Sequence, residues 1–421
     1  MMKKYLLLLT FVGLGISAMA QKQVFLPDSI RCYDLDDDNS RWSWKRSAQT
    51  ENLVFFWEKG FGHDLSNPPM LEGKPMKVDL DNLKERIESF YAYYRDTLRF
   101  TLPGSKADKY KMMVMLNYSL DGTAYGGTYD NFIGALWVAP NRIQDNKLNC
   151  MAHELGHSFQ LQIPADSVGD AWGGSGFYEM TSQWMLWLVN PDWLTDENYH
   201  FTAYSKAIHK AYLDGENIYR SPYVLQYWAM KRGKTCIGDL YRAGKRGEDP
   251  VITYKRLYGL TQEQFCDEMI DACQHIVTLD LGHAWDETRR YACTFDTPMK
   301  PGVKGYYSPA DEVLPEDYGF SAIRLQPVKA GKKVSATIKT DTPLRYAFVA
   351  VTSDGKAHYG TPVSAGKAEM KMPRGQEVEH LYLVVMGAPH EHKMLTWRNR
   401  EPNRQYPYEV KFKGTELNSE L

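Results

Sequence analysis

The pattern of apolar and polar positions changes twice along the chain. Early on, the apolar runs Asn52–Trp57 and Lys111–Leu116 predict buried strands, and Asp81–Tyr94 carries apolar residues at the spacing of an amphipathic helix. Helical spacing dominates from residue 146 to about residue 280. Beyond residue 310 apolar and polar positions alternate, which is typical of strands with one buried face. This order predicts an α+β fold that ends in a β-sandwich.

The same changes give the expected boundaries. An Asp-rich polar stretch indicates a solvated arm, and a later run rich in Pro and Gly indicates a linker. In order, we expect a solvated arm (21–50), an α+β half (51–161), a helical half (162–295), a linker (296–309) and a β-sandwich (310–421).

The first residues have the features of a secretory signal peptide. Lys3 and Lys4 precede an apolar run from Tyr5 to about Ile16, and small residues follow at positions 17–20. The run is shorter than the roughly 20 apolar residues that span a bilayer. We therefore expect residues 1–20 to be a signal peptide. The mature protein is expected to be periplasmic, on the cell surface or extracellular, with no integral membrane segment.

Composition narrows the functional classes. The chain has 421 residues, with 50 Lys and Arg against 52 Asp and Glu, and a formal charge of −2. This balance lacks the basic surface that binding to nucleic acid requires, so we expect no nucleic-acid partner. Six Cys in a chain of this length are too few for a disulfide scaffold. We expect a monomer.

One motif indicates chemistry. Met151–Gln160 contains His153-Glu154-Leu155-Gly156-His157, the HExxH pattern. On a helix, residues four apart project from one face, so His153 and His157 can bind one metal ion. Glu154 lies one residue round the helix from His153, close enough to reach a metal-bound water without binding the metal itself.

Catalytic zinc usually has three protein ligands and a fourth position for water. A longer motif with a third His is excluded, because Gln160 and Ile163 occupy the required Gly and His positions. The carboxylates that follow are Asp166, Asp170 and Glu179. The two Asp flank or lie in a Gly-rich connection, whereas Glu179 begins an apolar helix, where a buried carboxylate needs a cation. We therefore expect one Zn²⁺ per chain, with Glu179 as third ligand and the two Asp as alternatives.

This pattern resembles the gluzincin metallopeptidases, the thermolysin-like clan. The likeness is specific over about residues 125–190 and implies a catalytic domain over residues 51–295 that cleaves peptide bonds. Enhancin-like peptidases, which attack mucin-type glycoproteins, share the layout, so the resemblance implies a protein or glycoprotein substrate. In the clan an edge strand before the motif binds the substrate backbone, which implies Gly134, Ala135 and Leu136 here. Gln183 occupies the place where the clan often has an Asp behind a ligand His.

The resemblance also implies roles in catalysis. Glu154 would act as general base toward a zinc-activated water. A Tyr or His from the helical half would stabilise the oxyanion. The candidates are Tyr204, His209, Tyr223 and Tyr227, and we favour Tyr223 because it opens a helix after a Pro.

An alternative hypothesis is a protein that binds glycans or glycoproteins without catalysis, on a gluzincin-like fold. Aromatic residues make up 13% of the chain, and aromatic rings can stack on sugars. The intact His153, Glu154 and His157 argue against it, because a site without catalytic function has no need of Glu154. Two tryptophans with helical spacing, Trp184 and Trp187, are expected in the core instead.

Overall fold

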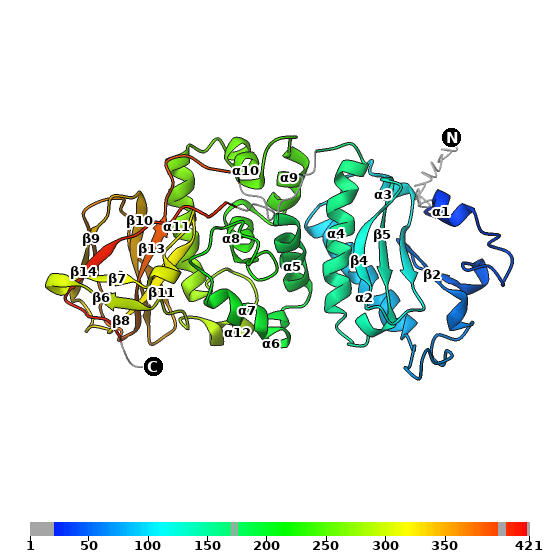
Figure 1. The fold of residues 1–421 in the computed structure, drawn as a ribbon, viewed down its shortest axis with the longest axis horizontal. Coiled ribbons are helices and arrows are strands. Elements are labelled where there is room, and N and C mark those ends of the chain that lie inside the picture. Colours follow the sequence, from blue (N-terminus) through cyan, green and yellow to red (C-terminus); the bar gives the residue numbers. More distant parts are fainter. Residues whose placement is uncertain (1–20, 170–171, 173–175, 395–400, 419–421) are drawn as a thin grey trace, which may run out of the picture.

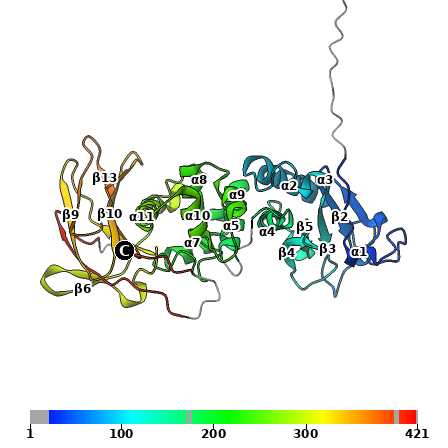
Figure 2. The ribbon, with the colours of Figure 1, turned by 90° about the horizontal axis from the view of Figure 1, so that it is seen from above.

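The structure is a computed structural model that describes residues 21–169, 172, 176–394 and 401–418. The expected signal peptide and Asp170 lie outside these residues. The described chain has the expected α+β composition, with three sheets. Figure 1 shows an N-terminal α/β half, a helical half and a C-terminal β-sandwich arranged in a row, and Figure 2 shows the same order from above.

The N-terminal half is built on a five-stranded sheet with the order β1-β2-β3-β5-β4. The central strands β2, β3 and β5 are parallel, and the edge strands β1 and β4 run antiparallel to their neighbours. The strands are β1 (Ser47–Gln49), β2 (Leu53–Trp57), β3 (Met112–Leu116), β4 (Ala124–Tyr129) and β5 (Ile133–Val138).

Both faces of this sheet are covered, as apolar runs without alternation require. Helices α2 (Leu80–Ala92) and α4 (Asn149–Ala165) pack on one face. The other face packs against Ile30, Leu35 and Trp42. Residues 21–50 are therefore not a solvated arm: scattered apolar residues in this polar stretch cover the sheet.

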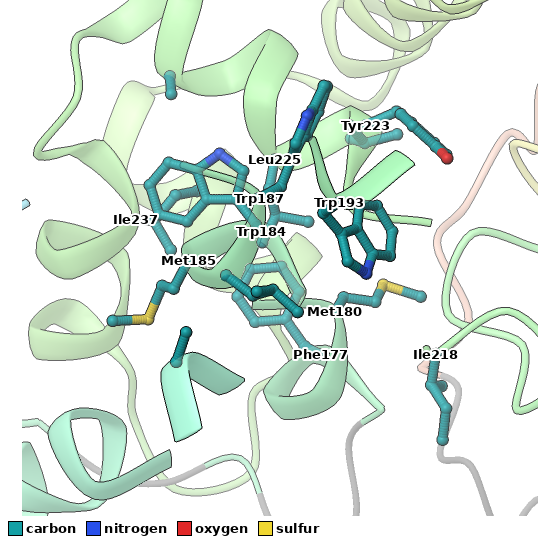
Figure 3. Packing of buried hydrophobic residues seen from close by; sticks show 14 of the residues in the cluster. Phe177, Met180, Trp184, Met185, Trp187, Trp193, Ile218, Tyr223, Leu225 and Ile237 are labelled. Carbon is teal, nitrogen blue, oxygen red and sulfur yellow. The ribbon is translucent and has the colours of Figure 1, made fainter. Parts of the chain in front are cut away.

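The helical half surrounds an aromatic core. Trp184 and Trp187 are buried in it as expected, together with Trp193 and Tyr223 (Figure 3). Its helices are α5 (Phe177–Val189), α6 (Trp193–Asp196), α7 (Asn198–Ser205), α8 (Tyr223–Arg232), α9 (Cys236–Ala243), α10 (Pro250–Tyr258), α11 (Gln262–Thr278) and α12 (Trp285–Thr288).

The C-terminal part is a two-sheet sandwich, with the strand orders β11-β10-β13-β8 and β12-β9-β14-β7-β6. The expected linker, residues 296–309, contains β6 and β7, which pair with each other in the second sheet. The prediction of a linker was therefore wrong for these residues, because proline is tolerated at the margin of a sheet. The strands are β6 (Met299–Pro301), β7 (Tyr307–Pro309), β8 (Phe320–Leu325), β9 (Lys333–Lys339), β10 (Leu344–Thr352), β11 (Ala357–Tyr359), β12 (Lys367–Lys371), β13 (Val378–Gly387) and β14 (Glu409–Lys413).

The sandwich is firmly joined to the helical half through α11. Arg345 of β10 pairs with Glu263 and Asp267, and the Gln274 amide donates to the backbone oxygens of Phe348 and Gly360. One apolar core runs without a break from the N-terminal sheet through the helices to β10 and β13. All six cysteines are free thiols. Among the described residues, no helix has the length and apolar character needed to cross a membrane.

Candidate metal centre

Two helices carry the candidate site, α4 from the α/β half and α5 from the helical half. They meet at Gly156, inside the HExxH motif. A Cβ atom at Gly156 would lie 2.9 Å from the Ser182 hydroxyl and 3.3 Å from the Met185 sulfur, so α5 packs directly on the backbone of α4. This close packing brings Glu179, in the first turn of α5, to the two histidines on α4.

The predicted donors His153, His157 and Glu179 meet in one cluster. The two Nε2 atoms are 3.0 Å apart, and each lies 3.1 Å from Oε2 of Glu179. A tetrahedral zinc ion with bonds of about 2.0–2.1 Å separates its donor atoms by roughly 3.4 Å. The three donor atoms therefore form a triangle close to the size that one zinc ion requires.

Of the two alternative ligands, Asp166 lies away from this cluster and Asp170 is outside the described residues. The Asp166 carboxylate accepts hydrogen bonds from the Ser105 hydroxyl at 2.5 Å, the Lys106 backbone N–H at 3.0 Å and the Gln162 amide at 2.9 Å. These contacts give Asp166 a structural role at the end of α4.

Two glutamine side chains set the orientation of the histidine rings. The Gln183 amide donates to the Tyr219 backbone oxygen at 2.9 Å, which leaves its oxygen 2.8 Å from Nδ1 of His153. In the same way, the Gln160 amide donates to Ser182, and its oxygen lies 3.1 Å from Nδ1 of His157. An oxygen partner requires a proton on each Nδ1, so both Nε2 atoms present a lone pair toward Glu179.

Three acceptor atoms this close repel one another unless a proton or a cation lies among them. The electrostatics of the cluster show this competition. Without a metal, a second proton on a ring can take this place: burial disfavours the ionised form of Glu179, but hydrogen bonds from Nε2 of His153 and His157 then hold its pKa well below the usual value. Burial also disfavours the charged form of His157, yet the hydrogen bond and charge of Glu179 prevail and raise its pKa. Two imidazole nitrogens and a carboxylate are a donor set that catalytic zinc sites use.

The cluster opens into a cavity of about 520 Å³. Glu154 lines it beside His153, as the motif predicts. Tyr219 lines it as well, with its ring stacked on that of His153 at 6.0 Å between centroids. Burial and the negative charge of Glu179 raise the pKa of Tyr219, so its hydroxyl stays protonated and can donate a hydrogen bond.

Comparison with known proteins gives a family without an assigned activity. The model of the family of unknown function DUF6055 matches residues 16–419. The chain belongs to DUF6055. A search of the curated proteins finds no match. The side chains of this DUF6055 chain itself are therefore the evidence for its chemistry.

In this DUF6055 protein the expected oxyanion donor, Tyr223, is not at the site. It is fully buried in the aromatic core against Trp187 and Tyr204, because the first turn of α8 faces inward (Figure 3). The other candidates, Tyr204, His209 and Tyr227, do not line the cavity either. Tyr219 does, from the loop before α8. No local sequence pattern marks this position, because the path of the loop depends on distant contacts such as the bond from the Gln183 amide to the Tyr219 backbone oxygen.

The expected substrate strand also needs correction. Gly134, Ala135 and Leu136 lie in β5, which pairs with β3 on one side and β4 on the other, so their backbone groups are occupied. The edge strand is β4, and its residues Tyr125 and Gly126 line the cavity. The pair Gly126-Gly127 could have marked a strand that approaches another backbone closely.

Proposed function

We propose that this protein is a zinc-dependent peptidase that hydrolyses peptide bonds in proteins or glycoproteins. The observation that supports it most directly is the convergence of three lone pairs from His153, His157 and Glu179, with both rings held from behind by glutamines. The crossing of an α/β half and a helical half at these donors agrees with the gluzincin resemblance. We also propose that residues 1–20 direct export of the protein.

The remaining groups of the cavity have the roles that hydrolysis requires. A zinc ion bound there would lower the pKa of a coordinated water and polarise a peptide carbonyl. Glu154 takes a proton from the attacking water and delivers it to the leaving amine. Tyr219 donates a hydrogen bond to the oxyanion that forms on the carbonyl oxygen. The edge strand β4 accepts the substrate backbone as an added strand alongside Tyr125 and Gly126.

Metal content and turnover test the proposal together. We expect about one zinc per chain in the mature protein, measured by inductively coupled plasma mass spectrometry, and its loss in His157→Ala and Glu179→Ala. Glu154→Gln should keep the zinc and lower peptide hydrolysis by about 10²- to 10⁴-fold.

Two results would contradict the proposal. A wild-type protein that takes up no zinc after dialysis with excess metal would favour the glycan-binding alternative. Hydrolysis that survives Glu154→Gln unchanged would refute the assigned general base.

A further inference from the structure

The cavity at the metal centre has a cationic end that the proposed chemistry does not use. Arg142 closes the 3-10 turn Pro140–Arg142 and lines the cavity. Its Nη2 atom lies 3.6 Å from the Cys150 sulfur, on the first turn of α4. Cys150 precedes His153 by three residues, which is about 4.5 Å along the helix axis. The guanidinium therefore lies within one or two residues of extended substrate from the histidine ligands, at about 3.3–3.6 Å per residue.

The carboxylate of Glu197 at this end of the cavity already has partners. Glu197, in the same cavity, accepts hydrogen bonds from Asn149 at 3.1 Å and from Trp193 at 3.0 Å, and lies 3.5 Å from His200. Its carboxylate is thus engaged by partners other than Arg142.

The nearest lysine in sequence gives a useful contrast. Lys147, on the same loop as Arg142, pairs with Asp192 at 3.1 Å and with Asp196 at 2.6 Å. Arg142 has no such partner: within the described parts of the chain its guanidinium forms no ion pair, and the Cys150 thiol is a weak acceptor. A cation that lines a cavity with its donors free has its hydrogen-bonding capacity available to a ligand.

We infer that Arg142 is a specificity residue that binds a carboxylate of the substrate, one or two residues from the bond that is cleaved. The inference rests on the proposed function and names the class of peptide that this site prefers. Guanidinium and carboxylate match as a planar, two-bond pair, which an amide cannot reproduce. The carboxylate can belong to an Asp or Glu side chain or to a free C-terminus, because both present the same two oxygens.

The apolar side chains near Arg142 in the cavity suit a substrate residue that has an apolar stem and a charged tip. Leu186 and Cys150 line the same cavity, and so does Tyr199, which is 65% exposed. A Glu side chain has this character, with methylene groups that contact the wall and a carboxylate that reaches the guanidinium.

Matched peptides test the inference. Cleavage sites are first located by mass spectrometry on a peptide library with zinc-loaded protein. A cleaved peptide is then made with Glu or Gln at each position flanking the bond, and with a free or an amidated C-terminus. We expect wild type to prefer one carboxylate form by about 10- to 100-fold in kcat/KM. The position of the effect tells whether a side chain or the C-terminus is bound.

The variants assign the preference to one residue. Arg142→Gln should abolish it, while the zinc content and the rate on the Gln-containing, amidated peptide stay near those of wild type. Lys147→Gln removes the same charge from the same loop outside the cavity, and should keep the full preference. Equal rates on all forms with wild type, or a preference that persists in Arg142→Gln, would overturn the inference.

A binding measurement separates this inference from the proposed function. If zinc-loaded wild type cleaves no peptide, the proposed function fails. Calorimetric titration with acetyl-Ala-Glu-amide, with acetyl-Ala-Gln that has a free C-terminus, and with acetyl-Ala-Gln-amide as the neutral control then decides the carboxylate site alone. Tighter binding of either carboxylate form than of acetyl-Ala-Gln-amide, lost in Arg142→Gln, supports the site, and equal binding of all three forms overturns it.

Discussion

At the scale of single residues, Gln183 and Gln160 determine how the two histidine rings of the candidate site are oriented. Each amide is fixed by its own donor bonds, so each presents oxygen to a histidine Nδ1. A neutral amide makes the imidazole a weaker base than a carboxylate partner would. The two glutamines thus fix the orientation of the rings, and in the proposed zinc site the affinity for the metal would depend more heavily on the charge of Glu179.

Two tyrosines four residues apart give a matched prediction. Tyr219→Phe should lower kcat by about 10²- to 10³-fold with zinc content unchanged, because it removes the hydrogen-bond donor to the oxyanion. Tyr223→Phe should leave kcat and the melting temperature near wild type, because the Tyr223 hydroxyl is buried without a hydrogen-bond partner among the described residues. Steady-state kinetics and thermal melts check both. A large loss of kcat in Tyr223→Phe alone would contradict the assignment.

The sequence predicts the residues whose spacing is local. His153 and His157 follow from the helical repeat, and Glu179 follows from burial at a helix start. Tyr219 could not be predicted, because its position depends on a loop whose path is set by distant contacts such as the Gln183 amide. The unpaired state of Arg142 is also invisible in the sequence, since it depends on which acids have other partners.

At the scale of elements, the closeness of β4 to α4 determines the shape of the site. A Cβ atom at Gly126 would lie 1.8 Å from the backbone oxygen of Glu154. Both groups belong to the main chain, so no side-chain rotation can relieve the clash. The strand proposed to bind substrate and the helix that carries the proposed general base are therefore held in contact through one glycine.

The substitution Gly126→Ala should accordingly destabilise the protein strongly. We expect it to lower the free energy of unfolding by about 2–3 kcal/mol or more and to reduce hydrolysis, because β4 must move away from α4. The neighbouring Gly127→Ala is the control, since its Cβ would meet the Tyr125 ring at 2.9 Å, a side chain that can turn aside. Urea unfolding measures both variants. Equal midpoints for the two would contradict the argument.

Elements with strong local signals are recovered from the sequence, and those that depend on partners are not. Helices α5 and α11 lie within the stretch that the helical spacing predicts, and α11 begins behind a capping box at Thr261. The strand Ala124–Tyr129 is interrupted by two glycines, so its pattern is weak, and it is stabilised by β5 and α4. This segment therefore forms a strand because of its tertiary contacts and not because of its local sequence.

At the scale of the whole molecule, the sandwich and the helical half share a core. The ring of Phe265 in α11 packs edge-on against Tyr318 at 5.2 Å, and the Tyr382 hydroxyl donates to the Cys293 backbone oxygen at 2.5 Å. Arg345, buried between them, forms its ion pairs across this contact. A surface of this kind is too apolar to be left exposed by either part.

We therefore expect the two parts to unfold together. Calorimetry of residues 21–421 should give one transition, and a chain ending at residue 295 should be aggregated or bind the hydrophobic dye ANS strongly, because the face of α11 is uncovered. A soluble, cooperatively folded chain of residues 21–295 would show that the sandwich is dispensable for folding.

The position of β14 in its sheet determines how late in synthesis the β-sandwich can finish folding. Val410 pairs with Ile338 on one side and with Tyr307 on the other, so the latest described strand lies in the middle of its sheet. During synthesis on the ribosome, the edges of β9 and β7 that later pair with β14 stay unpaired until β14 has been made. Closing this sheet requires pairing between residues far apart in the chain, which is slow. A chain that ends before residue 409 would lack the central strand and leave a gap inside the sheet. Loss of an edge strand, in contrast, would only make the sheet narrower.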